Sequence, residues 1–489
     1  MLFNSIQFIL FFLTVTSLYF ILPHKPRWFL LLAASCYFYM AFVPIYILIL
    51  FFTIVIDYIS GIYLERVNIK YKKIFLILSI VSNVGVLALF KYYNFFYDNI
   101  SVFTDSFGAA NPFPSIKILL PIGLSFHTFQ AMSYVIEVYR GNQKAERHFG
   151  IYALYVMFYP QLVAGPIERP QNMLHQFYEK HSFNYDDVVK GLRLILWGMF
   201  KKIVIADRLA IVVNHIYDDP FSQTGIPLII ATFFFTYQIF CDFSGYSDIA
   251  VGSAKVMGFN LMINFDRPYS ASSISEFWQK WHISLSTWFK DYLYIPLGGN
   301  KVKTVRLYFN LIIVFLISGF WHGANWTFVI WGALHGMYLI IGLALKNIYS
   351  NIRTPLLLYL KPFVGKLITF FLVSFAWIFF RASDLAKAKH IALHLFDNIF
   401  FQIKTIITNN DFGRSKFLYL NDQQDNILVG CCMILFLEFI HFIQGKKGSQ
   451  YFFEDKSIIV RWSFYSALLF LIVLLGVFNQ KNQFIYFQF

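Results

Sequence analysis

The chain has 489 residues, of which 58% are hydrophobic and only 13% are charged. A water-soluble protein of this length cannot bury so much apolar surface, so the composition excludes an ordinary soluble fold. The formal net charge is +14. The basic residues gather in short loops between apolar stretches, which is typical of cytoplasmic loops in membrane proteins. We therefore expect a multi-pass membrane protein in a lipid bilayer, with no nucleic-acid partner.

Apolar stretches that can enter a membrane recur along the whole chain, and some of them are too short to cross it completely. They cover residues 6–22, 28–43, 44–63, 74–97, 116–138, 151–165, 188–216, 226–252, 305–320, 326–345, 364–380, 427–444 and 458–478. We predict an all-α polytopic fold with roughly 11–13 membrane helices, plus re-entrant and amphipathic interfacial helices. Segment 151–165 is short and ends in Ala-Gly-Pro, which indicates a re-entrant segment that other protein surrounds.

Residues 264–300, NFDRPYSASSISEFWQKWHISLSTWFKDYLYIPLGGN, are rich in Trp and interrupted by charges. Ser272 or Ser273 can cap a helix there, because Glu276 follows at capping-box spacing. This pattern predicts one amphipathic helix at the membrane interface or partly inside the protein. Its apolar face consists of Phe277, Trp281, Leu285, Trp288 and Phe289. His282 lies within this predicted helix.

Residues 318–336 read SGFWHGANWTFVIWGALHG. Small residues such as Gly319 and Gly323 let helices approach closely and let a helix break inside the membrane. His322 lies at the predicted break, and His335 follows on the next span. A single His in a span is often only a polar contact between helices. Here a break, small residues and a second motif with His coincide, which favours a chemical role for His322.

A neutral imidazole is a suitable general base near pH 7. It can remove the proton from a hydroxyl that attacks an acyl carbonyl, while a second His binds the substrate or steadies the developing oxyanion. Neither a GxSxG elbow nor an HExxH motif is present, so direct transfer is favoured over a Ser acyl-enzyme or a metal hydrolase. We therefore predict His322 and His282 as catalytic residues. The four cysteines form no CxxC pair, so we predict no metal site.

Two further polar segments lie at the ends of apolar stretches: CDFSGYSDIAVG at 241–252 and YPQLVAGPIERP at 159–170. They support a buried site, although capping of helix ends and anchoring at the interface are an open alternative for both. The candidate substrate or tunnel residues from these segments and from 318–336 are His335, Asp242, Ser244, Tyr246, Gln161, Trp321 and Asn325.

Together these motifs resemble the membrane-bound O-acyltransferase family, in its bacterial branch of alginate O-acetyltransferase membrane subunits. The resemblance extends from about Met1 to Arg381, and its most specific parts are the segments at 264–300 and 318–336. The segment LPIGLSFHTFQAMSYVIEVYR at 120–140 also matches, except that His127 stands where Tyr or Phe is expected. Residues 384–489 match only weakly, apart from the tail FIYFQF.

The resemblance implies that the invariant catalytic His is His322, and that the second, more variable position is His282. His335 matches a His common in the bacterial branch. The implied fold is a ring of tilted helices around a thin centre, where funnels from both membrane faces meet. Because no repeat or linker divides the sequence, we expect one transmembrane domain over 1–489. Its parts are N-terminal helices at 1–140, a catalytic core with re-entrant segments at 141–345, and C-terminal helices at 346–489.

The resemblance also implies an activity. An acyl group, expected to be acetyl, would pass from a cytoplasmic thioester across the bacterial inner membrane to an exported or cell-surface polysaccharide. The donor would be acetyl-CoA or an acyl carrier protein, used as substrate rather than as a tightly bound cofactor. The expected partner is a periplasmic SGNH-type acetyltransferase. Two alternatives stay open: D-alanyl transfer from a carrier protein to teichoic acid, and a polysaccharide transporter or flippase without chemistry.

Overall fold

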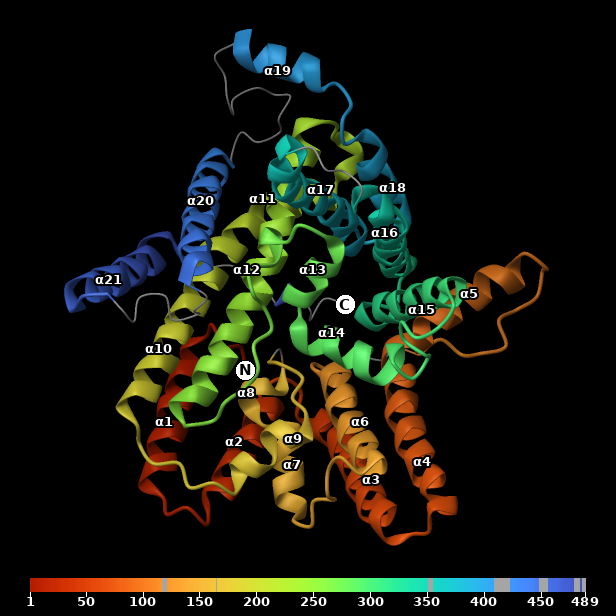
Figure 1. Cartoon of the computed structure of the whole chain (residues 1–489), viewed down its shortest axis with the longest axis vertical. Coiled ribbons are helices and arrows are strands. Elements are labelled where there is room, and N and C mark those ends of the chain that lie inside the picture. The colour runs from red at the N-terminus through yellow and green to blue at the C-terminus, as the bar shows by residue number, and fades with distance from the viewer. Residues whose placement is uncertain are drawn as a thin grey trace. The chain divides into compact units, whose positions relative to one another are not determined.

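A computed structural model describes residues 1–116, 121–163, 165–350, 355–408, 423–447, 456–478 and 484–485, with only the helical backbone described at 346–350, 355–360 and 446–447. Its regular structure is helical, and no β-strand occurs among these residues, which confirms the all-α prediction. Figure 1 labels the helices. The chain forms two compact units, one of Met1–Ile195 with Tyr246–Ile263 and one of Leu196–Gly245 with Asn264–Phe489.

The first unit contains the N-terminal helices and the end of α12. Its helices are α1 (Ile6–Ile21), α2 (Arg27–Met40), α3 (Ile47–Arg66), α4 (Ile69–Leu87), α5 (Tyr93–Asp105), α6 (Leu124–Arg140), α7 (Phe149–Met157), α8 (Tyr159–Leu162), α9 (Pro170–Met173) and most of α10 (Tyr185–Met199). A buried carboxylate joins α3 to α4. Asp57 Oδ1 accepts hydrogen bonds from Ser79 Oγ at 2.6 Å and from Asn83 Nδ2 at 2.9 Å. These donors offset the cost of a polar group in an apolar helix pair.

The predicted re-entrant segment at 151–165 consists of two short helices, α7 and α8, separated by Phe158. Neither helix is long enough to cross a bilayer. Residues 150–163 are all buried within the protein. This is the arrangement expected for irregular backbone at membrane depth, which needs protein around it to satisfy its polar groups.

The second unit contains the beginning of α12 (Ile226–Val256) and most of the C-terminal half of the chain. Its other helices are α11 (Asp207–Asp218), α13 (Ile274–Lys280), α14 (Ile283–Phe289), α15 (Thr304–His322), α16 (Trp326–Ser350), α17 (Pro355–Arg381), α18 (Leu385–His394), α19 (Ile399–Thr408), α20 (Gln424–Lys447) and α21 (Ile458–Leu475). Its core is strongly aromatic, and Trp281, Trp331 and Trp377 are among its largest fully buried side chains.

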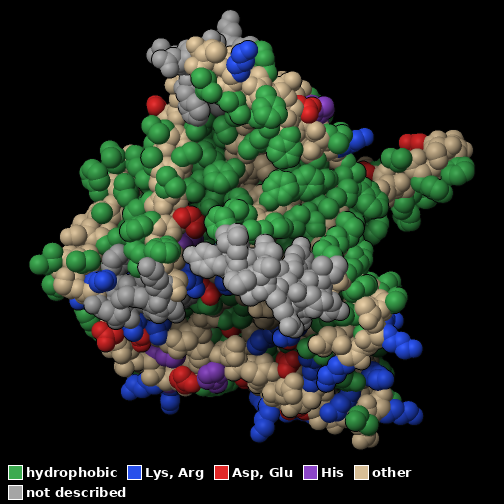
Figure 2. Space-filling view, turned by 45° about the horizontal axis from the view of Figure 1, so that its top comes forward, with side chains coloured by type: hydrophobic (Ala, Val, Ile, Leu, Met, Phe, Trp, Pro, Cys, Tyr) green, Lys and Arg blue, Asp and Glu red, His purple; other side chains and the backbone are tan. Residues whose placement is uncertain are grey.

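Eight helical segments among the described residues are long and apolar enough to cross a membrane. They are Pro44–Arg66, Ile69–Asp105, Ile226–Val256, Thr304–His322, Trp326–Leu345, Lys361–Arg381, Gln424–Gly445 and Ile458–Leu475. Hydrophobic side chains cover much of the surface in view in Figure 2. Surface of this kind needs lipid around it, because a soluble protein rarely exposes large apolar patches. The chain is therefore a multi-pass membrane protein.

One prediction about helix continuity is wrong. The amphipathic helix expected within 264–300 is two short helices, α13 and α14, and His282 lies at the break between them. A second interruption lies in the apolar stretch at 188–216, where a π-helical segment at Phe200–Ala206 separates α10 from α11. Both interruptions place polar residues inside the second unit, and both are important for the candidate site.

Candidate active site

The hairpin of α15 and α16 carries two of the three histidines. Helix α15 ends at His322, as the predicted break requires, and α16 begins four residues later at Trp326. Asn325 caps α16, because its Oδ1 accepts a hydrogen bond from Thr327 N at 3.0 Å. Asn325 also donates from Nδ2 to the carbonyl of Ser383 at 3.0 Å. Its observed contacts therefore fix the start of a helix.

Glycines let α15 and α16 approach each other at backbone distance. A Cβ atom built on Gly319 would lie 2.2 Å from the carbonyl oxygen of Phe328, and one on Gly332 would lie 2.2 Å from that of Phe315. A Cβ on Gly323 would lie 2.1 Å from the ring of Phe328. Since none of these distances is sterically allowed, the close packing that holds His322 beside α16 depends on the absence of side chains.

Replacing Gly332 with Ala should separate the two helices, because the clash is with backbone that cannot rotate away. We expect a loss of about 1–3 kcal/mol in stability, typical of overpacking, together with reduced activity. Thermal unfolding of the detergent-purified protein measures the first effect. Gly342→Ala on the same helix is the matched control, because a Cβ there meets nothing within 4 Å. Equal unfolding temperatures for the two variants would contradict this account.

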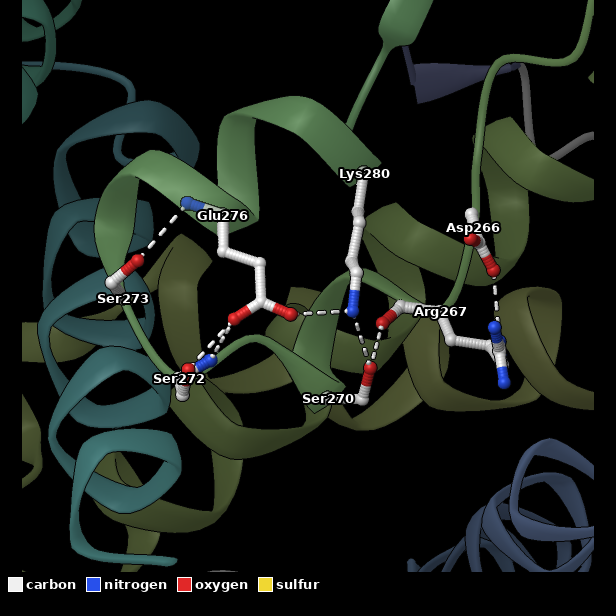
Figure 3. A network of polar contacts seen from close by, with 7 residues as sticks. All are labelled: Asp266, Arg267, Ser270, Ser272, Ser273, Glu276 and Lys280. Atoms are coloured by element: carbon white, nitrogen blue, oxygen red, sulfur yellow. Dashed lines mark hydrogen bonds and ion pairs between the residues drawn. The ribbon is translucent and has the colours of Figure 1, made fainter. Parts of the chain in front are cut away.

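A polar network fixes the start of α13 (Figure 3). Ser273 is the N-cap, and its Oγ accepts a hydrogen bond from Glu276 N at 3.1 Å. The Glu276 side chain accepts from the backbone N of Ser272 at 2.8 Å and from Lys280 Nζ at 2.7 Å. Burial alone would raise the pKa of Glu276, but the hydrogen bonds from Lys280 and Ser272 lower it to about 2. The predicted capping signal is confirmed, with Ser273 as the cap.

His282 is held in a strained position. Its backbone has φ 42° and ψ 56°, a left-handed conformation that residues other than Gly rarely adopt. Asn264 holds the following turn, since its carbonyl oxygen accepts from Ile283 N at 2.9 Å and its Oδ1 accepts from Ser284 Oγ at 2.6 Å. The His282 side chain is fully buried. Burial lowers its pKa to about 3, so the ring is neutral near physiological pH.

The three histidines and two tryptophans form a continuous row of rings in the second unit, which we name the His–Trp row. It consists of His282, Trp321, His322, Trp331 and His335. The distances between successive ring centroids along it are 6.5, 4.9, 5.0 and 5.0 Å. The structure therefore brings together the three histidines that the sequence singled out, and each neighbouring pair shares one Trp ring.

The rings around the row are also aromatic, so its histidines lie in surroundings of low polarity. Phe380 lies 5.4 Å from the His322 ring, and Phe243 lies 4.6 Å from the His282 ring. His322 is only 4% exposed. An imidazole in such a place can accept a proton from a substrate while the protein excludes competing water.

Asp242 and Ser244 lie near the row but belong to a cluster of buried charges. Lys202 Nζ lies 2.8 Å from Asp207 Oδ1 and 2.6 Å from Asp242 Oδ1. Lys201 Nζ donates to Ser244 Oγ at 2.9 Å. We name Lys201, Lys202, Asp207 and Asp242 the charge cluster. Two positive and two negative groups balance within it, which is the condition for burying ions at tolerable cost.

The charge cluster also holds a short part of the chain's C-terminal end. Asp242 Oδ2 accepts a hydrogen bond from the backbone N of Ile485 at 2.7 Å. The neighbouring Phe484 ring lies 5.7 Å from Phe243, which itself contacts His282. Asp242 is therefore connected to the His–Trp row through packing.

Three residues that the sequence singled out lie in the first unit, with contacts of their own. Tyr246 donates to Asn4 Oδ1 at 3.4 Å. Gln161 donates to the carbonyl of Tyr155 at 2.6 Å. His127, whose presence departs from the expected motif, is buried on α6 with its ring 6.0 Å from that of Tyr39. None of these contacts involves a residue of the His–Trp row.

The sequence interpretation missed three groups at this site. Trp331 is one helical turn before His335 on α16, so helical periodicity was a usable signal. Trp278 donates from Nε1 to His335 Nδ1 at 3.3 Å, and Lys202 joins two carboxylates, but both contacts depend on tertiary packing. Within the described part of the chain, no three His, Cys, Asp or Glu side chains gather so that they could hold a metal ion.

Comparison with known proteins identifies the family. The family model described as MBOAT, membrane-bound O-acyltransferase family, matches residues 147–383, which include the whole His–Trp row. A "Probable alginate O-acetylase" of Pseudomonas aeruginosa is 40% identical over 392 residues, covering 79% of this chain and 73% of that protein. The chain belongs to the membrane-bound O-acyltransferase family. It is therefore an O-acyltransferase, and the resemblance noted in the sequence is confirmed.

Two further relatives of this membrane-bound O-acyltransferase match very different shares of its length. A "Peptidoglycan O-acetyltransferase" of Helicobacter pylori is 38% identical over 425 residues, covering 80% of this chain and 79% of the relative. A "Teichoic acid D-alanyltransferase" of Streptococcus thermophilus is 32% identical over 237 residues, covering only 45% of this chain and 56% of the relative. The proteins named O-acetyltransferase or O-acetylase thus match nearly twice as much of the chain.

Proposed function

We propose that this O-acyltransferase transfers an acetyl group from a cytoplasmic thioester across the bacterial inner membrane, for O-acetylation of an exported or cell-surface polysaccharide. The observation that carries the proposal is the His–Trp row, in which His322 lies almost fully buried at the end of α15. The names of the relatives with the widest coverage support acetyl as the group and a polysaccharide as the final acceptor.

His322 is the proposed general base. Its imidazole removes the proton from the hydroxyl of the acceptor as the hydroxyl oxygen attacks the thioester carbonyl. The new C–O bond forms, the C–S bond breaks, and the imidazolium returns the proton to the leaving thiolate. His282, which burial keeps neutral, orients the substrate by hydrogen bonding.

The proposed donor is acetyl-CoA or an acyl carrier protein, both of which carry negative charge. The turn between α3 and α4 offers a matching surface, because Arg66, Lys70 and Lys73 are exposed there. A cluster of basic side chains attracts an anionic donor and favours the cytoplasmic side for that turn. The donor is consumed as a substrate, so no tightly bound cofactor is required.

The proposed partner is a periplasmic SGNH-type acetyltransferase that places the acetyl group on the polysaccharide. The burial of the His–Trp row inside a multi-pass protein supports this division of work. In this proposal a small carrier or partner group, rather than the polymer itself, delivers the hydroxyl that accepts the acetyl group at the row.

The test is thioester consumption by the full-length protein in lipid nanodiscs. Acetyl-CoA, acetylated carrier protein and D-alanylated carrier protein are supplied separately, and thiol release is measured with and without the partner. We expect release from an acetyl donor that His322→Ala abolishes. Preference for the D-alanyl donor would support the teichoic-acid alternative. A wild-type protein that leaves all three thioesters intact would contradict acyl transfer and favour a transporter.

A further inference from the structure

The hydrogen bond between Trp278 and His335 fixes the protonation of the His335 ring. Trp278 Nε1 lies 3.3 Å from His335 Nδ1. An indole nitrogen can only donate, so Nδ1 must be the acceptor with its lone pair. A neutral His335 therefore carries its proton on Nε2. Because its only lone pair already accepts a hydrogen bond, this ring is a donor and is poorly suited to act as a base.

The Nε2–H group of His335 has no acceptor among the residues that the structure describes, although it is fully buried. The same holds for the Nε1–H group of Trp331. The two ring centroids are 5.0 Å apart. Buried donors are usually paired, because water that would satisfy them has been removed. Two such donors on neighbouring rings of the His–Trp row indicate a place where a ligand supplies the acceptor.

The surroundings define the chemistry of that acceptor. The His335 ring contacts Phe277, Phe315 and Trp377, with centroid distances of 6.3, 6.2 and 6.3 Å. A charged carboxylate or phosphate would lack a compensating cation among these rings. An uncharged oxygen attached to a small apolar group fits, and the carbonyl of an acyl thioester has this character. His335 and His322 both contact Trp331, so the site adjoins the proposed base.

We propose that His335 Nε2–H, with Trp331 Nε1–H beside it, donates hydrogen bonds to the carbonyl oxygen of the acyl group during transfer. This inference rests on the proposed function and adds the group that stabilises the developing oxyanion. Donors that are held in place before reaction strengthen as negative charge grows on the oxygen. Trp278 is the positioning residue, because it holds the tautomer in which His335 donates.

Kinetics of three variants test the donors. His335→Phe keeps an aromatic ring but removes the donor, and we expect kcat to fall about 10²-fold with a smaller change in KM. Trp331→Phe keeps its ring and loses only the indole N–H, so kcat should fall as well. His335→Gln supplies an amide oxygen for Trp278 and an N–H for the carbonyl, and should recover about tenfold over Phe. Wild-type kcat in His335→Phe would overturn the proposal.

Infrared difference spectroscopy provides a readout that needs no turnover. In a His322→Ala background, the thioester that the wild type consumes is bound with a ¹³C-labelled acetyl carbonyl. We expect a carbonyl stretch at lower frequency than in solution, and a return toward the solution value when His335→Phe is added. An unchanged frequency would overturn the proposal and indicate that these N–H groups only face aromatic rings. A wild type that neither binds nor consumes any acetyl thioester would instead overturn the proposed function, and this inference with it.

Discussion

Replacing His322 with Ala is expected to lower acyl transfer by roughly 10²–10⁴-fold, the range that loss of a general base produces. The imidazole is buried against Trp331 and Phe380, so no solvent group can take over the proton. Thiol release from the donor, measured in nanodiscs, gives the rate. Release at the wild-type rate would show that His322 is not the base.

Two further variants separate chemistry from folding in this experiment. His322→Gln keeps a polar side chain of similar length but a much weaker base, and should be nearly as inactive as Ala while unfolding at the wild-type temperature. His175→Ala is the matched control, because its side chain is 58% exposed in the first unit. It should leave transfer unchanged. Loss of membrane insertion in both His322 variants, with normal insertion of His175→Ala, would point to a structural role for His322 instead.

The break at His322 was predictable because its cause is local. Gly319 and Gly323 lie on either side of it, and the structure shows that a side chain at either position would overlap Phe328. The break at His282 was not predictable. The apolar spacing of Trp281 and Leu285 continues through it, so periodicity indicates one helix. The left-handed turn is held by Asn264, which comes from outside both short helices.

The histidines of the candidate site could be selected from the sequence, but their geometry could not be predicted from it. Composition and two motifs were enough to select His282, His322 and His335. Their arrangement in a row depends on Trp331, whose contacts with His322 and His335 follow from the packing of α15 against α16. Sequence also cannot show which nitrogen of His335 carries a proton, because that depends on Trp278 from α13.

For the charge cluster too, the contacts between residues could not be predicted from the sequence. Asp242 was selected as a candidate substrate residue because it lies at the end of an apolar stretch. Its carboxylate contacts Lys202, which lies in a π-helical segment that hydropathy presents as part of a continuous span. The counter-ion of Asp242 is thus a residue 40 positions away in sequence. Pairing of this kind requires the tertiary fold, because neither residue type specifies its partner.

Replacing Lys202 with Met should be among the most destabilising single changes in the second unit. It leaves Asp207 and Asp242 buried without the ammonium group that lies within 2.8 Å of both. Breaking a buried ion pair by removing one partner costs about 3–5 kcal/mol, because the remaining charge is uncompensated. The thermal unfolding midpoint in detergent and the yield of inserted protein measure this loss.

The cause of the lost stability can be tested by removing carboxylate charge from the Lys202→Met variant. Lys202→Met combined with Asp207→Asn removes one charge of each sign, so that Lys201 and Asp242 keep the cluster neutral, and Asp242 keeps its hydrogen bond from the backbone N of Ile485. We expect this double variant to be clearly more stable than Lys202→Met alone. Lys255→Met removes a more exposed pair with Asp187 in the first unit and should cost at most about 1 kcal/mol. If the double variant is no more stable than the single one, the loss comes from packing of the lysine stem, and charge compensation is not what holds the cluster together.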